Sequence, residues 1–234
     1  DVAEADTVTL VKDIMADCFG FDKNFELTSE QQIRGTFCDL AVKIDNKIQF
    51  LIEVKAAGIE LNDSHIRQAI NYGATEGIEW IVLTNAIDWK LYRMKFGQPI
   101  DFDEVTSFNI LELNPKNEED LKKVFLLCRE GLSIGAMDSF HQTAQILNRY
   151  TIGQVIQSES ILGAVRRDFR KLFPEVKIDA SDISDMLVNE ILKRDVTEGD
   201  KVVEAKSRIK KASQKLARKA AKKAKEKEQS ESPE

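Results

Sequence analysis

The chain has 234 residues, of which 42% are hydrophobic and 32% are charged, a composition typical of a water-soluble globular protein. No apolar run approaches the roughly 18 residues that a membrane-spanning helix needs, so we expect no membrane contact. Its three cysteines have no paired spacing and it has only two histidines, which disfavours a disulfide framework or a zinc site and favours a reducing cytoplasm.

Residues 4–19 place their apolar side chains on one side of a helix, which predicts an amphipathic helix that ends at Gly20. A short strand is expected at about 24–30. Two longer strands are expected at about 36–44 and 48–56, because both segments are rich in apolar residues and are bounded by polar turns.

A tight turn and a second helix are predicted next to these strands. The segment Asp45-Asn46-Lys47 is typical of a hairpin turn. A helix is expected to start at Asn62 or Asp63, either of which can cap it, and to run to about Thr75, with Gly77 closing it.

Two further strands complete the predicted sheet. Residues 79–84 form a continuous apolar run, as in a strand covered on both faces, and residues 88–96 alternate between apolar and polar. After Pro115 the pattern changes to four helical segments without a comparable strand signal. The sequence therefore predicts an α/β fold, with a mixed β-sheet core flanked by helices and an all-helical C-terminal region after it.

These changes of character predict three parts: a sheet-containing domain at 1–115, a helical region at 116–199, and a Lys/Ala-rich tail at 200–234 that is helical or disordered. Residues 201–234 hold 12 Lys/Arg against 5 Asp/Glu, whereas the rest of the chain holds 22 against 35. An acidic body with a basic tail occurs in nucleic-acid-binding proteins, and also in proteins whose tails are merely solvated. The candidate phosphate contacts in the tail are Lys210, Lys211, Lys215, Arg218 and Lys219.

The strongest functional signal lies in residues 36–72. Side chains alternate along the strand at 48–56, so Glu53 and Lys55 share one face with an apolar neighbour. A carboxylate and an ammonium on a central strand are costly unless they are paired or bind an ion. The same cost applies to Asp39 on the preceding strand, because its neighbours there are apolar. Three such charges on adjacent strands favour a functional site over a half-solvated surface.

The predicted helix after these strands carries Gln68 and Tyr72 one turn apart, on a strip beside its apolar face. We expect this strip to face the strand ends where Asp39, Glu53 and Lys55 gather. His65 lies on the same strip and is more typical of a helix surface than of a catalytic base.

The chemistry of these residue types points to a metal ion. Asp39 and Glu53 are hard oxygen ligands suited to Mg²⁺ or Mn²⁺, and the backbone carbonyl of Val54 can add a ligand. Such an ion orients and acidifies a water molecule and neutralises charge on a phosphate. Lys55 is expected to position that water or to stabilise the transition state, while Gln68 and Tyr72 hold the scissile strand or the network around Lys55.

Taken in order, these residues resemble the PD-(D/E)xK nuclease superfamily, and within it the N-terminal nuclease domain of the type I restriction enzyme R subunit. In that family an Asp on one strand precedes a Glu-x-Lys on the next, and a helix then carries Gln-x-x-x-Tyr. The matching positions here are Asp39, Glu53, Lys55, Gln68 and Tyr72.

The resemblance covers about residues 3–113 and implies a restriction-endonuclease-like fold, DNA as the substrate and other restriction-system subunits as partners. It also implies that an early acid, Glu4 here, approaches the metal. The segment Thr84-Asn85-Ala86 resembles a turn of the family in which glycine is typical at the third position.

A complete R subunit continues into an ATP-driven DNA translocase, but this sequence has no Gly-x-x-x-x-Gly-Lys-Ser/Thr loop, so no ATP site is expected. The sequence therefore predicts a metal-dependent DNA endonuclease. Two alternatives stay open. One is a DNA-binding or assembly module of a restriction- or phage-related system that keeps the nuclease fold without cutting. The other is an interaction protein whose function lies in the helices at 116–200.

Overall fold

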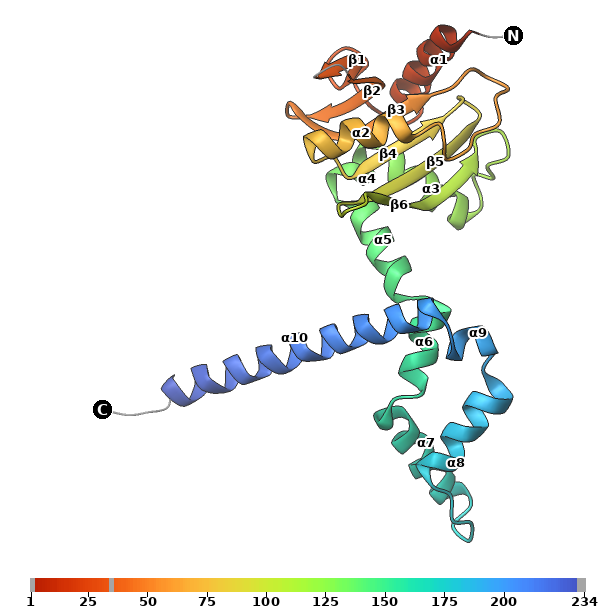
Figure 1. The fold of residues 1–234 in the computed structure, drawn as a ribbon, viewed down its shortest axis with the longest axis vertical. Coiled ribbons are helices and arrows are strands. Elements are labelled where there is room, and N and C mark those ends of the chain that lie inside the picture. The colour runs from red at the N-terminus through yellow and green to blue at the C-terminus, as the bar shows by residue number, and fades with distance from the viewer. Residues whose placement is uncertain (1–2, 34–35, 231–234) are drawn as a thin grey trace. The chain divides into compact units, whose positions relative to one another are not determined.

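The computed structural model describes residues 3–33 and 36–230. The chain forms two compact units, a sheet unit up to His141 and a helical unit from Gln142 onwards (Figure 1). Each unit is described by itself. No helix in the described ranges is both long enough and apolar enough to cross a membrane.

The sheet unit is built on a mixed sheet of six strands whose spatial order is the same as their order in the chain. Neighbouring strands are antiparallel except for β3 and β4, which are parallel because a helix connects them. The strands are β1 (Leu27–Ile33), β2 (Thr36–Ile44), β3 (Lys47–Val54), β4 (Trp80–Thr84), β5 (Asp88–Lys95) and β6 (Asp101–Asn109).

The strands expected at 36–44, 48–56, 79–84 and 88–96 are confirmed within about two residues, whereas the strand expected at 24–30 begins later, at Leu27. Sequence reasoning missed β6. This strand pairs with β5 along one side only, and none of its side chains is fully buried. Its acidic and polar residues therefore suit an edge position but give a weak strand signal.

The hairpin between β2 and β3 turns through Asp45 and Asn46, as the sequence predicts. Both residues have positive φ, 50° and 61°, and they separate the paired residues Ile44 and Lys47. A two-residue loop of this kind matches the right-handed twist of the strands, and Asp and Asn tolerate this backbone conformation well. The ladder between the two strands then shifts register between Val42 and Lys43, which marks a β-bulge.

Helices of the sheet unit cover both faces of the sheet. They are α1 (Glu4–Asp17), α2 (Arg67–Glu76), α3 (Glu118–Leu127), α4 (Arg129–Ser133) and α5 (Ala136–Ile146), the last of which continues past the unit boundary. The helix predicted at 4–19 is confirmed as α1. Helix α2 ends at Gly77, whose φ is 70°, as predicted.

Helix α2 begins at Arg67, later than the sequence predicts. Asn62 does not cap the helix, because its side-chain oxygen accepts a hydrogen bond from the backbone N–H of Ser64, and its carbonyl oxygen accepts one from His65. These bonds form a turn before the helix.

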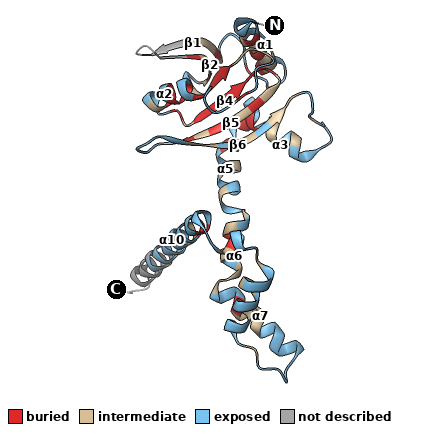
Figure 2. Cartoon of the chain, turned by 45° about the vertical axis from the view of Figure 1, so that its right-hand side comes forward, coloured by how far each residue is buried: buried red, intermediate tan, exposed pale blue. Residues whose placement is uncertain are grey.

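The core lies on both sides of the sheet, and Figure 2 shows the central strands mostly buried. Phe50, Ile52 and Val54 pack on the side of α1, together with residues of α3, α4 and α5. Leu51 points to the opposite side and packs against Tyr72 of α2. This alternation confirms the side-chain pattern predicted for β3.

The helical unit has a much smaller core. Its helices after α5 are α6 (Arg149–Ile156), α7 (Glu159–Leu172), α8 (Ala180–Met186), the π-helical turn η1 (Leu187–Ile191), α9 (Arg194–Thr197) and α10 (Asp200–Ser230). Gly153 of α6 lets α9 approach closely, because an added Cβ would lie 2.3 Å from a methyl carbon of Val196. The helical C-terminal region predicted from the sequence is confirmed.

Candidate active site

Two carboxylates lie side by side where β2 and β3 end their pairing. Glu53 belongs to β3 and is buried, with 3% of its surface exposed, while Asp39 belongs to β2 and is half-buried. One Asp39 carboxylate oxygen (Oδ2) accepts a hydrogen bond from the backbone N–H of Val54, at 2.7 Å. This bond fixes Asp39 against the end of β3.

Lys55 joins this pair from the residue after β3. Its ammonium donates to Glu53 Oε1 at 2.6 Å and to the carbonyl oxygen of Val54 at 3.1 Å. Glu4, at the start of α1, lies 3.9 Å from the same ammonium. The structure thus brings together Asp39, Glu53, Lys55 and Glu4, four of the residues singled out in the sequence.

The charges of this group are unbalanced. Burial raises the pKa of Glu53 to about 7; the hydrogen bond from Lys55 opposes that rise, and the negative charges of Asp39 and Glu4 add to it. For Lys55, burial disfavours the ammonium, but the hydrogen bond to Glu53 and its charge outweigh this, so the pKa lies above its ordinary value. Three carboxylates around one ammonium leave a net negative charge, which favours binding of a cation.

The segment after Lys55 is held by its neighbours. The backbone N–H of Lys55 donates to the Thr84 carbonyl oxygen at 2.8 Å, and Asn85 donates its side-chain N–H to the carbonyl of Ile59 at 2.9 Å. On the other side, Thr7 of α1 accepts a hydrogen bond from the backbone N–H of Ala57, at 3.1 Å. These bonds position Lys55 by fixing the backbone on both sides of the loop.

Sequence reasoning missed the supporting roles of Thr7 and Asn85, both of which are buried. A signal existed for Thr7, because it lies one turn before Val11 on the predicted apolar face of the first helix. Asn85 directly follows an apolar strand, a common place for a residue that fixes a turn.

The structure does not join Gln68 and Tyr72 to the carboxylates. Gln68 is exposed on α2, and no described hydrogen bond links its side chain to Asp39, Glu53 or Lys55. Tyr72 is fully buried and packs against Leu51, and its hydroxyl has no hydrogen-bond partner among the described atoms. Tyr72 faces the sheet because it lies one turn after Ala69, on the buried side of the helix.

Cys38, next to Asp39, is not a candidate nucleophile. Burial and the nearby charge of Glu53 raise the pKa of its thiol to about 12. The thiol therefore stays protonated near neutral pH, and it donates a hydrogen bond to the carbonyl oxygen of Leu40.

Trp89, Tyr92 and both histidines make contacts within the fold. Trp89 is fully buried and stacks edge-to-face on Phe19. Tyr92 is also buried and donates to Asp63 in the loop before α2. His141 packs edge-to-face on Trp80, and His65 takes part in the turn with Asn62.

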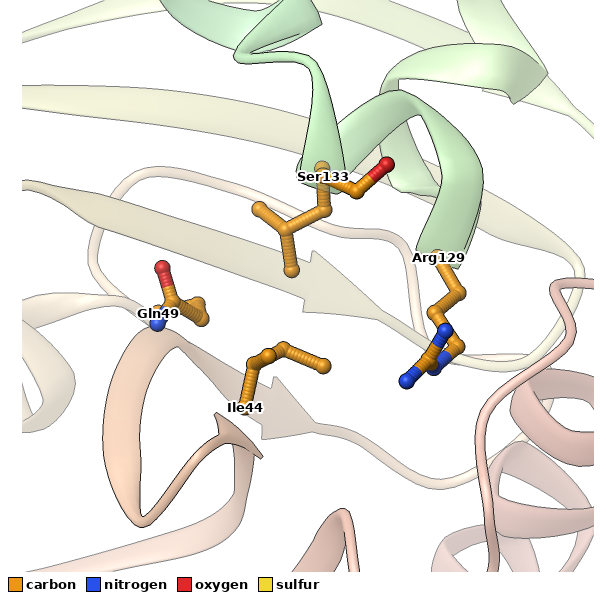
Figure 3. A pocket seen from close by; sticks show the side chains of 5 residues that line it. Ile44, Gln49, Arg129 and Ser133 are labelled. Carbon is orange, nitrogen blue, oxygen red and sulfur yellow. The ribbon is translucent and has the colours of Figure 1, made fainter.

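A cavity of about 240 Å³ lies at the opposite end of the β2–β3 hairpin (Figure 3). It is lined by Ile44, Gln49, Arg129, Leu132 and Ser133. Arg129 donates a hydrogen bond from its Nε to a carboxylate oxygen (Oε1) of Glu26, at 2.8 Å. Since the lining residues Ile44 and Gln49 lie near the hairpin turn, this cavity is separate from the carboxylate pair.

The donors at the carboxylate pair suit a hard divalent cation. Asp39, Glu53 and the carbonyl of Val54 offer oxygen atoms, which Mg²⁺ and Mn²⁺ prefer. Within the described ranges, however, no three or more His, Cys, Asp or Glu side chains gather closely enough to hold a metal by themselves. A bound ion would thus need the backbone carbonyl and water as further ligands.

One known family matches the part of the chain that contains these residues. Residues 11–108 match the type I restriction enzyme R protein N terminus. The similarity to the nuclease domain of R proteins, expected from the sequence, is confirmed. The R-protein match runs from α1 to β6 and includes Asp39, Glu53, Lys55, Gln68 and Tyr72, but not Glu4 or the helical unit. Comparison with curated proteins and with solved structures returned no match.

Proposed function

We propose that this protein is a metal-dependent DNA endonuclease that hydrolyses phosphodiester bonds. The observation that carries the proposal is the buried carboxylate Glu53, held beside Asp39 and Lys55 at the end of β3. The R-protein match over the same residues supports a restriction-related nuclease. DNA as the substrate, restriction-system partners and a cytoplasmic setting follow from that relationship and are part of the proposal.

Asp39, Glu53 and the Val54 carbonyl are proposed to hold Mg²⁺ or Mn²⁺, with Glu4 close enough to add negative charge. When bound, the ion supplies an acidified water and neutralises charge on the phosphate. The carboxylates of Glu53 and Asp39 are held in fixed positions, because the first is buried and the second accepts a hydrogen bond from the Val54 N–H. Since burial disfavours the charged form of Glu53, a cation bound beside it would favour that form.

Lys55 is proposed to stabilise the charge that develops on the phosphate oxygens. Its ammonium keeps its proton, since its pKa is raised, and Glu53 fixes its direction. Gln68 is exposed on α2 and is proposed to contact the DNA strand. Tyr72 is proposed to act indirectly, because its buried ring fixes α2 against Leu51.

The test is cleavage of a supercoiled plasmid with Mg²⁺ or Mn²⁺ by the intact protein, Glu53→Ala and Lys55→Ala. The controls are Glu60→Ala and Lys47→Ala, which remove an exposed acid and an exposed lysine from nearby segments. We expect cleavage by the intact protein and by both controls only. Equal cleavage by all five proteins, or none by the intact protein, would contradict the proposal.

The alternative is a module that binds DNA or assembles with a partner but does not cut. One observation favours it: the Lys55 ammonium already pairs with Glu53 and contacts the Val54 carbonyl, so these groups are satisfied without an ion. Thermal unfolding with added Mn²⁺ separates the two functions. A bound ion stabilises the folded protein by about 2.7 kcal/mol at a concentration 100 times its Kd. No stabilisation, together with intact DNA binding, would favour the module.

A further inference from the structure

Helix α10 has an anchored base and an exposed stem. Near its start Val202 and Ala205 are buried, and Arg208 donates to the carbonyl oxygen of Gln145 in the same unit. From Lys210 to Lys219, every side chain is exposed (Figure 2). The stem is therefore held at one end by the helical unit and surrounded by solvent along its length.

The stem carries positive charge without compensation. From Lys210 to Lys219 the stem holds five Lys/Arg and no Asp/Glu, and no acid lies within one turn of either of these residues. None of the ion pairs among the described side chains includes a cation between Lys206 and Lys219. A helix that served only as a solvated tail would gain stability from acids placed one turn from its lysines, and this stem has none.

The cations are concentrated on one side of the stem. At about 100° per residue, four of them fall within an arc of about 100°, which we call the basic face: Lys211, Lys215, Arg218 and Lys219. Ile209 and Leu216 lie on a different side, Ala212 borders the arc, and Lys210 lies outside it. Lys211, Lys215 and Lys219 follow one another at intervals of one turn, where like charges repel and weaken a helix.

We propose that the basic face binds the phosphate backbone of duplex DNA. A polyanion would remove the repulsion along the helix, and the choice of DNA as that polyanion rests on the proposed nuclease function. From Lys211 to Lys219 the helix rises about 12 Å, a length that spans three to four phosphates of one strand. Lysine contacts to phosphate carry no sequence information, so this binding is independent of DNA sequence.

The test uses the full chain with four substitutions on the basic face: Lys211→Gln, Lys215→Gln, Arg218→Gln and Lys219→Gln. Glutamine has a helix propensity similar to that of lysine, so α10 is retained, and circular dichroism checks this. The matched control also removes four exposed cations of the helical unit, through Arg170→Gln, Lys171→Gln, Lys193→Gln and Arg194→Gln. Fluorescence anisotropy measures binding to a labelled duplex in EDTA, from 50 to 200 mM salt.

Loss of four phosphate contacts makes the plot of log K against log salt shallower by about 3 to 4. Between 50 and 200 mM salt, the intact protein and the control therefore lose roughly 100-fold more affinity than the basic-face variant. An unchanged slope in the basic-face variant, or the same change in the control, would overturn the proposal.

Two further results keep this proposal separate from the nuclease function. A variant with Lys211→Arg, Lys215→Arg and Lys219→Arg keeps the charge and is expected to keep the slope of the intact protein. Because binding is measured in EDTA, failure of plasmid cleavage would refute the nuclease function and leave the slope comparison intact.

Discussion

The sheet unit and the helical unit use charge in opposite ways. Among the described side chains of the sheet unit, Glu53 is the one buried carboxylate, and it lies among strands whose apolar side chains are packed on both faces. In the helical unit, charges are numerous and exposed, and so are large apolar side chains such as Leu172, Ile191 and Leu216. A strand ladder can hold one costly charge in place, whereas a helix surrounded by water can present many charges at little cost.

The two units also differ in how firmly their charged residues are held. Asp39 and Lys55 are each held by hydrogen bonds from neighbouring strands or loops, which suits chemistry that depends on short distances. The stem of α10 is held only at its base, which suits contacts to a phosphate backbone that has no single register.

The largest expected effect concerns stability, compared between a core position of the sheet unit and an exposed position of the helical unit. Phe50→Ala removes a fully buried ring from the sheet unit and is expected to lower its free energy of unfolding by about 3 to 5 kcal/mol. Leu216→Ala, on the exposed stem, is expected to change stability by less than about 0.5 kcal/mol. Urea unfolding followed by circular dichroism reports on both units, while the fluorescence of the two tryptophans, which lie in the sheet unit, reports on that unit by itself. Similar costs for the two substitutions would contradict the contrast between the units.

The next effect concerns catalysis. Lys55→Gln keeps a hydrogen-bond donor but removes the charge, and is expected to slow plasmid cleavage by about 100- to 1,000-fold. Lys47→Gln, at the tip of the same hairpin, is the control and is expected to cleave normally. If Mn²⁺ raises the thermal stability of Lys55→Gln as much as that of the intact protein, the substitution impairs the chemical step of cleavage and not metal binding.

The third effect concerns pH. Because the pKa of Glu53 is raised in the folded protein to about 7, its contribution to stability is present below about pH 4.5 and is lost as the pH rises towards 7. In EDTA, the free energy of unfolding is expected to fall over this window by on the order of 3 kcal/mol. Glu53→Gln is expected to flatten the dependence. An intact protein with the same pH profile as Glu53→Gln would show that burial of this carboxylate costs little.

The smallest effect concerns the hairpin turn. Asn46→Gly replaces a residue of positive φ with the one that adopts this conformation most easily, and is expected to stabilise the sheet unit by about 0.5 to 1 kcal/mol. Thermal unfolding followed by tryptophan fluorescence measures this change. Destabilisation would mean that the Asn46 side chain stabilises the turn by more than its backbone strain costs.

Local signals explain what could be predicted from the sequence. The turn at Asp45-Asn46, the glycine that ends α2 and the alternation along β3 each depend on a few adjacent residues, and all three are confirmed. The meeting of Asp39, Glu53 and Lys55 was also predictable, because the three lie on consecutive strands or next to them.

What could not be predicted depends on distant partners. The burial of Tyr72 follows from the packing of α2 on Leu51 and Ala41, which the helical pattern alone does not define. The hydrogen bond from Val54 to Asp39 exists only because β2 and β3 stop pairing at that point. The packing of Leu126, Leu127 and Met137 on the sheet joins segments far apart in the chain.

The bulge in the β2–β3 hairpin limits which insertions and deletions related sequences can accept in this hairpin. From the turn, Ile44 pairs with Lys47, and that register would place Asp39 opposite Ile52, on the face away from Glu53. Because Gln49 is left over at the bulge, Leu40 pairs with Ile52 instead, and the next pair along aligns Asp39 with Glu53. Relatives with a hairpin of different length can keep both acids on one face only by gaining or losing such an extra residue. Insertions at this surface turn are therefore expected in compensated combinations and not singly.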